Sequence, residues 1–517
     1  MSRMKKVQLA RWNEPLLMQM SHEGERGMLV DDAGEKIKER CGDVAAKLPD
    51  SVRRTTKIEL PELSQPHVYR HYLRLSQMTM GQALTPDISQ GTCTMKYSPI
   101  INETLCMEDG MTEMHPLQDV STMQGTLEMH YRLQEMLKEI SGMDAICLQG
   151  SGGSQGVYIN ACLIRAYHES RGEGELRNEI ISTAFSHPID CAAPHTVGFK
   201  VITLYPNPET GYPSVEALKA AISSHTAGLM ITNPEDTGIY NPNIEEFVKL
   251  IHEAGGLCAY DQANANGILG VARARDAGFD LCHFNLHKTF SSPHGSYGPG
   301  CAASCVVKKL EPFLPKPVVV YRDGKYDLDY DRPQSIGKAR SFLGNVQVML
   351  RCYAWIMSLG ADGLRKVAEL AVLNNNYLLK RLMELDGFEL PYPKGGQRLE
   401  QTRYSLDKVF RDTGITGSDI RRRVVDYGIQ SYHESHFPVI IPNPVTLEPT
   451  ETYSKEDMDY YVDMFKEIIH DAYADPSLIK NAPEFGETSQ INEDYANDER
   501  TRAMTWRAYV KKNGSKV

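Results

Sequence analysis

Three residues that could act together in amine chemistry follow predicted buried strands of this sequence. Asp261 ends the apolar run LCAYD (257–261), Lys288 follows the run FDLCHFNL (279–286), and His187 follows NEIISTAFS. A lysine amine can form an imine with a carbonyl group, a carboxylate can keep a pyridine nitrogen protonated, and an imidazole can stack on a flat ring. Each residue alone also has an ordinary explanation: a solvated strand end, a helix cap and a core hydrogen bond.

A glycine-rich turn, GSGGSQG at 150–156, follows another predicted strand and opens a helix. Backbone N–H groups at a helix start, together with the helix dipole, favour a bound phosphate. Glycine-rich turns are common, so this turn supports a phosphate site only in combination with the other three residues. Together the four features are the parts of a pyridoxal 5'-phosphate site. Lys288 would form the Schiff base, Asp261 would stabilise the pyridinium, and His187 would lie over the ring.

Alternating strands and helices must position these residues. The segment TLEMHYRLQEMLKEISG predicts a helix that stops at Gly142, AGLMITN (227–233) predicts a buried strand, and IEEFVKLIHEAGG predicts a helix. This alternation predicts an α/β fold with a mostly parallel sheet covered by helices on both faces. Ligands of such sheets gather at the carboxyl ends of the strands, where all four features fall.

Composition divides the chain into four parts. We expect an N-terminal arm at 1–80, a large cofactor-binding domain at 81–330, a smaller C-terminal α+β domain at 331–480 and a tail at 481–517. The small domain is predicted from long helical patterns that begin at VQVML and from a strand-like segment, FPVIIPN, at 437–443.

Bulk properties exclude several classes of protein. The chain has 517 residues, of which 41% are hydrophobic and 24% charged, as in an ordinary globular protein. A net charge of −11 argues against nucleic-acid binding. No apolar run approaches the roughly 18 residues of a membrane helix. The start has no apolar signal segment, so we expect a cytoplasmic location. The 11 cysteines include no CxxC pair, which suits reduced thiols better than a metal site.

Long segments of the chain resemble a known family. The stretch NLHKTFSSPHGSYGPG resembles the cofactor-lysine motif of glycine dehydrogenase (decarboxylating), the P-protein of the glycine cleavage system. The chain as a whole is similar to the second subunit of the two-subunit bacterial form, from about residue 60 to 480. The similar segments include QGTCTMKYSPIINE, EISGMDAICLQ, ITNPEDTGIYNP, IHEAGGLCAYDQANANGILG and YDLDYDRPQSIGKARSFLGN.

The resemblance implies a fold, a reaction and partners. The fold would be that of the type I aminotransferases. Glycine would displace Lys288 from pyridoxal phosphate, lose its carboxylate as carbon dioxide and attack the lipoyl disulfide of a carrier, the H-protein, leaving an aminomethyl group there. The chain would act in an oligomer, homomeric or with a first P-protein subunit. No nicotinamide takes part in this step.

Three sets of site residues are expected. The catalytic residues would be Lys288 and His187. The cofactor would be bound by Lys288, Asp261, His187, Ala263, Gly152, Gly153, Ser154, Gln155, Thr232, Asn285 and His287. If the strand continued through Lys288, however, His287 would face the other side. The substrate side would include Thr94, Lys96, His115, Asp190, His294, Ser296, Tyr297 and Arg340.

Some substrate-side residues have a second explanation. The resemblance suggests that Thr94 and Lys96 reach the cofactor mouth of a neighbouring subunit, and the alternative is a structural turn. The same two explanations apply to His115. His294 lies so near the lysine in sequence that we favour a role in the pocket. Arg340 could bind a carboxylate through two hydrogen bonds or form an interdomain salt bridge.

Three segments depart from the family pattern. HPIDCAA stands where the family has HGTNPAS, which brings in Asp190. PHGSYGPG replaces PHGGGGPG, so Ser296 and Tyr297 add side chains. RLEQTRYS replaces RMHEFVLS, so Glu400 and Gln401 stand in place of a His-Glu pair. Glycine needs little room, and bare glycines permit close approach.

Three functions therefore stay open. The first is retained glycine chemistry. The second is a divergent decarboxylase or lyase that acts on another amino acid or without the lipoyl carrier. The third is a non-catalytic interaction subunit, against which the joint presence of Lys288, Asp261 and His187 argues.

Overall fold

The main sheet of the protein is built from strands that alternate with helices along the chain. The computed structural model describes residues 4, 6–28, 31–56, 60–80, 86, 88, 96–293, 298–488, 490–499, 502 and 505–513. The strands of the main sheet are β1 (Ala145–Gly150), β2 (Glu179–Thr183), β3 (Lys200–Leu204), β4 (Thr226–Thr232), β5 (Leu257–Gln262), β6 (Leu281–Asn285) and β7 (Ala302–Val306). The helices around them are α3 (Ile100–Cys106), α4 (Asp109–Thr112), α5 (Gln124–Ser141), α6 (Gly153–Ser170), α7 (Ile189–Val197), α8 (Val215–Ala221) and α9 (Ile244–Glu253).

Parallel pairing dominates this sheet. The described residues form a seven-stranded sheet in the order β1-β7-β6-β5-β4-β2-β3. β3, β2, β4, β5 and β6 pair in parallel, and β7 runs antiparallel between β6 and β1. The carboxyl ends of β1, β2, β4, β5 and β6 therefore lie at one edge of the sheet. The predicted mostly parallel α/β sheet is confirmed.

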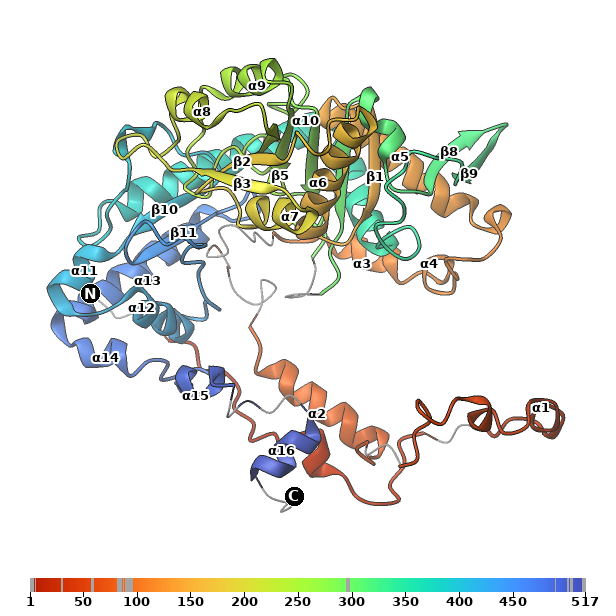
Figure 1. Cartoon of the computed structure of the whole chain (residues 1–517). Coiled ribbons are helices and arrows are strands. Elements are labelled where there is room, and N and C mark those ends of the chain that lie inside the picture. The colour runs from red at the N-terminus through yellow and green to blue at the C-terminus, as the bar shows by residue number, and fades with distance from the viewer. Residues whose placement is uncertain are drawn as a thin grey trace. The chain divides into compact units, whose positions relative to one another are not determined.

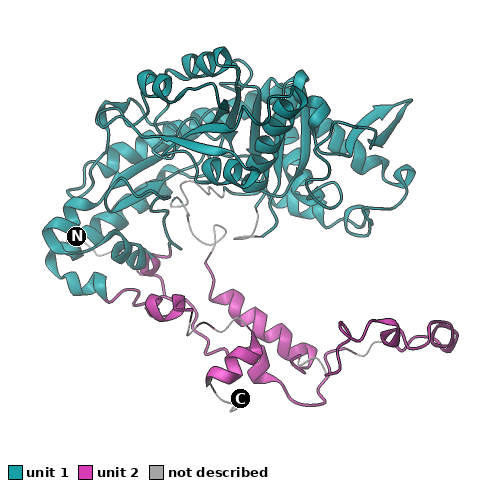
Figure 2. Ribbon diagram, viewed as in Figure 1, with its two compact units in different colours: residues 1–4, 81–424, 429–480 teal, residues 5–80, 425–428, 481–517 magenta. Residues whose placement is uncertain are grey.

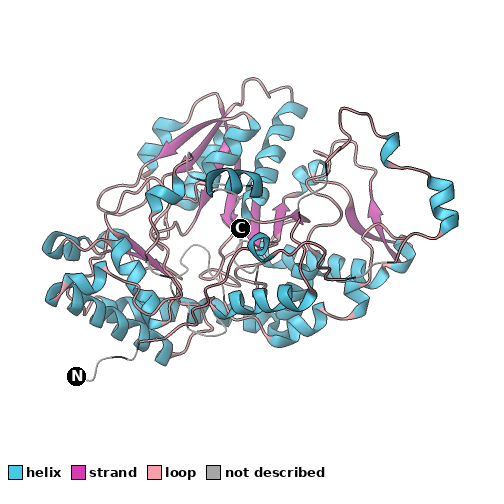
Figure 3. Ribbon diagram, turned by 90° about the horizontal axis from the view of Figure 1, so that it is seen from below, coloured by secondary structure: helices cyan, strands magenta, loops and turns pink. Residues whose placement is uncertain are grey.

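Burial explains why these segments read as strands in the sequence. Every residue of β1, β2, β5, β6 and β7 is buried, so their apolar runs have no polar alternation. Helices α8 and α9 pack on one side of the strands and α7 on the other, as Figure 1 shows. In Figure 3 the strands are flanked by helices when seen from below. The predicted helix that stops at Gly142 is α5, which ends with Gly142 in the left-handed conformation.

The segment at 318–480, which follows the main sheet, is mainly helical. It contains β8 (Val318–Arg322), β9 (Lys325–Asp329), α10 (Val346–Leu382), β10 (Thr402–Ser405), α11 (Asp407–Thr413), α12 (Gly417–Arg423), β11 (Pro444–Leu447), α13 (Lys455–Ala474) and α14 (Pro476–Lys480). The long helix α10 is interrupted at Gly360, whose backbone is not helical. β10 and β11 form a two-stranded antiparallel sheet.

The predicted strand at 437–443 is wrong. That segment has no strand, and the strand of this region, β11, begins one residue later at Pro444. Pro438 and Pro442 explain the difference because neither has the backbone N–H that a paired strand donates.

The described chain forms two compact units, which Figure 2 colours teal and magenta. The first unit comprises residues 1–4, 81–424 and 429–480, and the second comprises 5–80, 425–428 and 481–517. The second unit contains α1 (Glu35–Cys41), α2 (Gln65–Gln77), α15 (Glu493–Asn497) and α16 (Trp506–Asn513). Our division into arm, two domains and tail stays a prediction. No helix of the described residues is both long and apolar enough to span a membrane.

Candidate active site

Asp261 lies near the middle of the main sheet, at the carboxyl end of β5. Thr232 of β4 and His283 of β6 are its register partners on either side. Its Oδ1 accepts a 2.8 Å hydrogen bond from the backbone N–H of Ala263 and lies 3.3 Å from Nε2 of His283. Only 5% of the residue is exposed, so a charge on this carboxylate acts on its neighbours with little screening by water.

Lys288 lies in a turn just beyond β6, at the same edge of the sheet. β6 ends at Asn285, and the backbone N–H of Lys288 donates a 3.1 Å hydrogen bond to the Asn285 carbonyl. Like Asp261, the lysine is buried. Because the strand has already ended, the alternation that would turn His287 away from Lys288 does not apply. His287 instead lies against β7, with Nδ1 3.0 Å from the carbonyl oxygen of Cys301.

His187 follows β2 and is held at two points. Its backbone N–H donates to Thr232 Oγ1 at 3.4 Å, and its Nδ1 accepts a 3.1 Å hydrogen bond from the backbone N–H of Ile189. Burial, and then the charge of Lys288, lower the pKa of His187 to about 4, while the charge of Asp261 opposes the change. The imidazole is therefore neutral near pH 7, and His187, Lys288 and Asp261 are close enough to interact.

Asp190 follows His187 in sequence and lies in the first turn of α7. It is 1% exposed and accepts a 3.3 Å hydrogen bond from Thr232 Oγ1. Burial, and then the charge of Asp261, raise the pKa of Asp190 well above its ordinary value. Burial and the neighbouring Asp261 thus both disfavour the charged form of Asp190.

The glycine-rich turn connects β1 to α6, as predicted. Gly152 precedes the first helical residue, Gly153. A Cβ on Gly153 would lie 2.7 Å from Nδ2 of Asn285, so the turn and the end of β6 pack directly on each other. The side chain of the half-buried Gln155 accepts hydrogen bonds from Ser151 and donates one to the Ala339 carbonyl at 2.6 Å. Ser154 is exposed on the first turn of the helix.

Asn285 fits a site that receives a polar ligand. The residue is buried between the glycine-rich turn and Lys288, and within the described part of the chain its Oδ1 has no hydrogen-bond partner. A buried polar atom without a partner is costly in a folded protein unless a ligand or water completes it. The edge of the sheet beside Lys288 thus offers a buried polar atom to a bound ligand.

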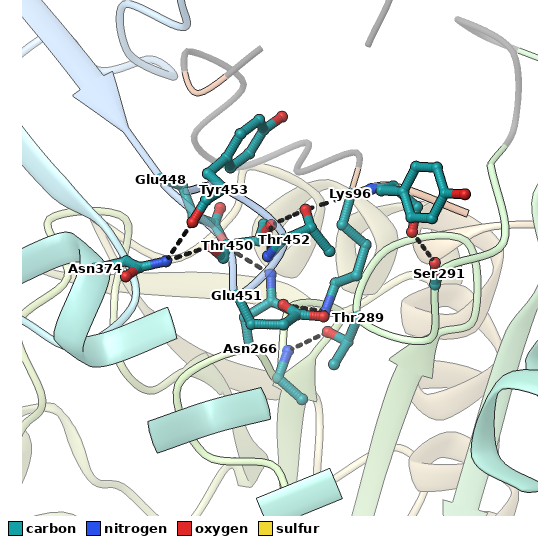
Figure 4. Close-up of polar contacts among 12 residues, drawn as sticks. Lys96, Asn266, Thr289, Ser291, Asn374, Glu448, Thr450, Glu451, Thr452 and Tyr453 are labelled. Atoms are coloured by element: carbon teal, nitrogen blue, oxygen red, sulfur yellow. Dashed lines mark hydrogen bonds and ion pairs between the residues drawn. The ribbon is translucent and has the colours of Figure 1, made fainter. Parts of the chain in front are cut away.

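The substrate-side predictions have different outcomes. Thr94, His294, Ser296 and Tyr297 lie outside the described residues. Lys96 is buried and pairs with both carboxylate oxygens of Glu451 at 2.9 Å, which favours its structural alternative (Figure 4).

His115 and Arg340, also of that set, have different surroundings. His115 is exposed in a surface turn, where its Nδ1 accepts from the Leu117 backbone. Arg340 forms no ion pair within the described residues, and its buried Nη1 has no hydrogen-bond partner there.

Several charged residues near His187 were not expected from the sequence. Asp236, in the turn after β4, is buried and receives a 2.6 Å contact from His436 Nδ1 and a 3.4 Å contact from Arg403. Glu235 beside it is also buried, and burial raises its pKa to about 8. The HESH segment around His436 was the signal that could have pointed to this group.

Comparison with known proteins gives consistent results. A family model described as glycine dehydrogenase, C-terminal domain, matches residues 367–480. A relative from Pyrococcus abyssi named probable glycine dehydrogenase (decarboxylating) subunit 2 is 41% identical over 504 residues, which are 97% of each chain. A relative of the same name from Caldanaerobacter subterraneus subsp. tengcongensis is 41% identical over 90% of this chain and 94% of its own.

Solved structures agree on the fold. A crystal structure of inhibitor-bound glycine decarboxylase (P-protein) matches with a TM-score of 0.71 at 20% identity, over 85% of this chain and 100% of that one. A NifS-like protein matches with a TM-score of 0.57 at 17% identity, over 74% of this chain and 98% of that one. The expected type I aminotransferase fold is confirmed. Given the extent of identity to its relatives, the chain belongs to the family of glycine dehydrogenase (decarboxylating) subunit 2.

Proposed function

We propose that this chain decarboxylates glycine with the help of pyridoxal 5'-phosphate and passes the remaining aminomethyl group to the lipoyl arm of an H-protein. The observation that carries the proposal is the 41% identity, over 97% of both chains, to a probable glycine dehydrogenase (decarboxylating) subunit 2. The words "subunit 2" in that name support a first P-protein subunit as partner. The scattered cysteines favour a reducing compartment, and we include a cytoplasmic location in the proposal.

The residues at the carboxyl edge of the sheet would hold the cofactor. Lys288 would attach it through Nζ, Asp261 would face its ring nitrogen, and the turn around Gly153 would receive its phosphate at the start of α6. Asn285 and His287, packed against the same turn, would border the phosphate side. When bound, the cofactor supplies a sink for the electron pair left behind by the departing carboxylate.

The protonation states of the neighbouring residues support this assignment. A neutral His187 can lie against an aromatic ring without adding a positive charge, and its lowered pKa of about 4 keeps it neutral. Burial and the charge of Asp261 raise the pKa of Asp190, which disfavours a second negative charge beside Asp261. A single carboxylate in a buried setting holds a proton on a ring nitrogen more strongly than one in water would.

Replacing Lys288 tests the enzymatic role. The purified protein incubated with pyridoxal phosphate should absorb near the edge of the visible range, and Lys288→Ala should abolish that band while the variant still folds. The control is Lys309→Ala, which changes a lysine that follows β7 and pairs with Asp280, at the opposite edge of the sheet from Lys288. A wild-type protein that takes up no cofactor would contradict the proposal and leave the non-catalytic subunit as the better explanation.

A second candidate is decarboxylation of an amino acid other than glycine. It is favoured by the buried charges of Asp236 and Arg403 near His187, which offer groups that glycine does not need. Carbon dioxide release should be measured over a panel of amino acids, with and without lipoylated carrier. Release from glycine that depends on the carrier supports the first function. Turnover of another amino acid without turnover of glycine supports the second.

A further inference from the structure

A chain of polar contacts leads from the two-stranded sheet toward His187. Arg403 on β10 is 2% exposed, and its Nε donates a 2.8 Å hydrogen bond to Thr446 Oγ1 on β11. Its Nη2 lies 3.4 Å from Oδ2 of Asp236, in the turn after β4. The guanidinium is thus fixed at one end by the small sheet and at the other by a residue of the main sheet's edge.

Asp236 is anchored on both its side chain and its backbone. Its Oδ2 lies 2.6 Å from Nδ1 of His436, and its backbone N–H donates a 3.1 Å hydrogen bond to the Phe185 carbonyl, two residues before His187. Burial alone would raise the pKa of Asp236, but the hydrogen bond from His436 and the charge of Arg403 hold the pKa well below its ordinary value. Asp236 is therefore a carboxylate, and His436 donates to it from Nδ1.

His436 in turn contacts the ring of His187. The two ring centroids are 4.5 Å apart with an interplanar angle of 64°, an edge-to-face arrangement. The only ring nitrogen of His187 that accepts a described hydrogen bond, Nδ1, takes it from Ile189, so the proton of the neutral ring is on Nε2. One contact holds the ring at a nitrogen, and the other places the ring of His436 against it. Together they restrict rotation of the imidazole about its side-chain bonds.

We propose that His436 and Asp236, anchored by Arg403, are positioning residues that hold the ring of His187 in the orientation needed to stack on the cofactor. The inference rests on the proposed function, since stacking by His187 is part of it. It adds that the β10–β11 sheet determines the position of a residue at the main sheet's edge. Arg403, Asp236 and His436 are called the positioning chain below.

The test compares Asp236→Asn and His436→Ala with the unchanged protein. Asp236→Asn keeps the shape of the side chain but removes the charge that fixes His436. His436→Ala removes a ring that is 21% exposed, so this variant should fold even if the buried one does not. Asp329→Asn, on β9, is the control. It also removes the charge of an ion-paired aspartate, whose partners are Arg322 and Arg332.

Two readouts are needed. The first is the imidazole resonance of His187 in cofactor-free protein labelled with ¹³C-histidine, assigned with His187→Gln. The second is the dissociation constant of pyridoxal phosphate, followed by absorbance. We expect both variants to shift or broaden the His187 resonance and to weaken cofactor binding by between about twofold and tenfold, the range of one edge-to-face ring contact. The double variant should bind the cofactor no more weakly than the single variant with the larger loss, because both substitutions act through the same chain of contacts.

Each result decides the inference. An unchanged His187 resonance in both variants would overturn it, and so would an unchanged dissociation constant in both. An equal effect of Asp329→Asn would show that general loosening is the cause, which also overturns it. If the unchanged protein binds no pyridoxal phosphate, the proposed function fails, and the His187 resonance then decides alone whether the positioning chain exists.

Discussion

Buried carboxyl groups near the site differ in charge because their neighbours differ. Asp236 has Arg403 and His436 beside it, and they hold its pKa well below its ordinary value. Within the described residues no cation lowers the pKa of Glu400: burial, and then the charge of Glu448, raise it to about 8. Burial alone thus neutralises a carboxyl group, and a paired cation reverses that effect.

Glu400 should make the stability of the protein depend on pH. Its folded-state pKa of about 8 lies above the ordinary 4.5, so the folded protein keeps a proton that the unfolded chain releases. The free energy of unfolding should therefore fall as pH rises from 4.5 toward 8, by at most about 1.4 kcal/mol per pH unit from this group. Glu400→Gln, which mimics the protonated form, should reduce that slope in urea unfolding measured at several pH values.

The control for this prediction is Glu369→Gln, an exposed glutamate on α10. It should leave the slope as it is in the unchanged protein. Equal slopes for Glu400→Gln and the unchanged protein would show that Glu400 is ionised in the fold.

At the scale of elements, the backbone of the turn after β4 is in direct contact with the backbone just before β10. Gly238 has a φ of +77°, and a Cβ there would lie 1.8 Å from the carbonyl oxygen of Gln401. The Leu399 N–H also donates to the Gly238 carbonyl at 3.0 Å. This contact brings Asp236 within reach of Arg403, so the positioning chain depends on a glycine that it does not include.

Gly238→Ala should destabilise the protein more than a comparable glycine substitution. Gly414 has a similar φ of +72° with open space around it, so Gly414→Ala should cost only the strain of the left-handed backbone, about 1 kcal/mol. Gly238→Ala adds a backbone collision and should cost more than about 3 kcal/mol. Urea unfolding of both variants measures the difference. Similar midpoints for the two would mean that the turn moves away from Gln401 at little cost.

The elements of the main sheet were predictable because each is encoded locally. Buried strands are continuous apolar runs, and Asp261, Lys288 and the 150–156 turn each follow such a run directly. The positioning chain was not predictable, since Asp236 and His436 are 200 positions apart in sequence. The segment 437–443 carries apolar residues without forming a strand, because Pro438 and Pro442 interrupt it. Its apolar character does not mark burial either, since Phe437 is 82% exposed and Val439 is 51% exposed.

Over the whole first unit, segments far apart in sequence meet around the turn that carries Lys288. Lys96 pairs with Glu451 across a separation of 355 positions and lies 5.2 Å from the ring centre of Trp355 on α10. Beside it, the Tyr97 carbonyl accepts a 2.5 Å hydrogen bond from Ser291 (Figure 4). The turn is thus bound to the segment at 96–97, which is itself bound to the residues after β11.

Removing one partner of the Lys96–Glu451 pair should cost more than removing both. Lys96→Met leaves a carboxylate without a cation in a largely buried place and should lower the free energy of unfolding by about 3–5 kcal/mol. The double variant Lys96→Met/Glu451→Gln should recover a large part of that loss. Urea unfolding of the single and double variants gives the comparison. A double variant as unstable as the single one would mean that the pair stabilises through its own attraction and not by mutual neutralisation.

The antiparallel direction of β7 has a consequence for how this family can vary. Because β6 ends and β7 begins at the same edge of the sheet, the connection from Leu286 to Cys301 leaves and returns at one place. Residues added to such a connection need not change the register of either strand, and doubling a loop costs only about 0.6 kcal/mol of closure entropy. The register of β6 and β7 therefore does not fix the length of this connection. Because Phe290 and Ser292 are completely buried, changes of length are best placed near the exposed Gly298 and Pro299, away from Lys288.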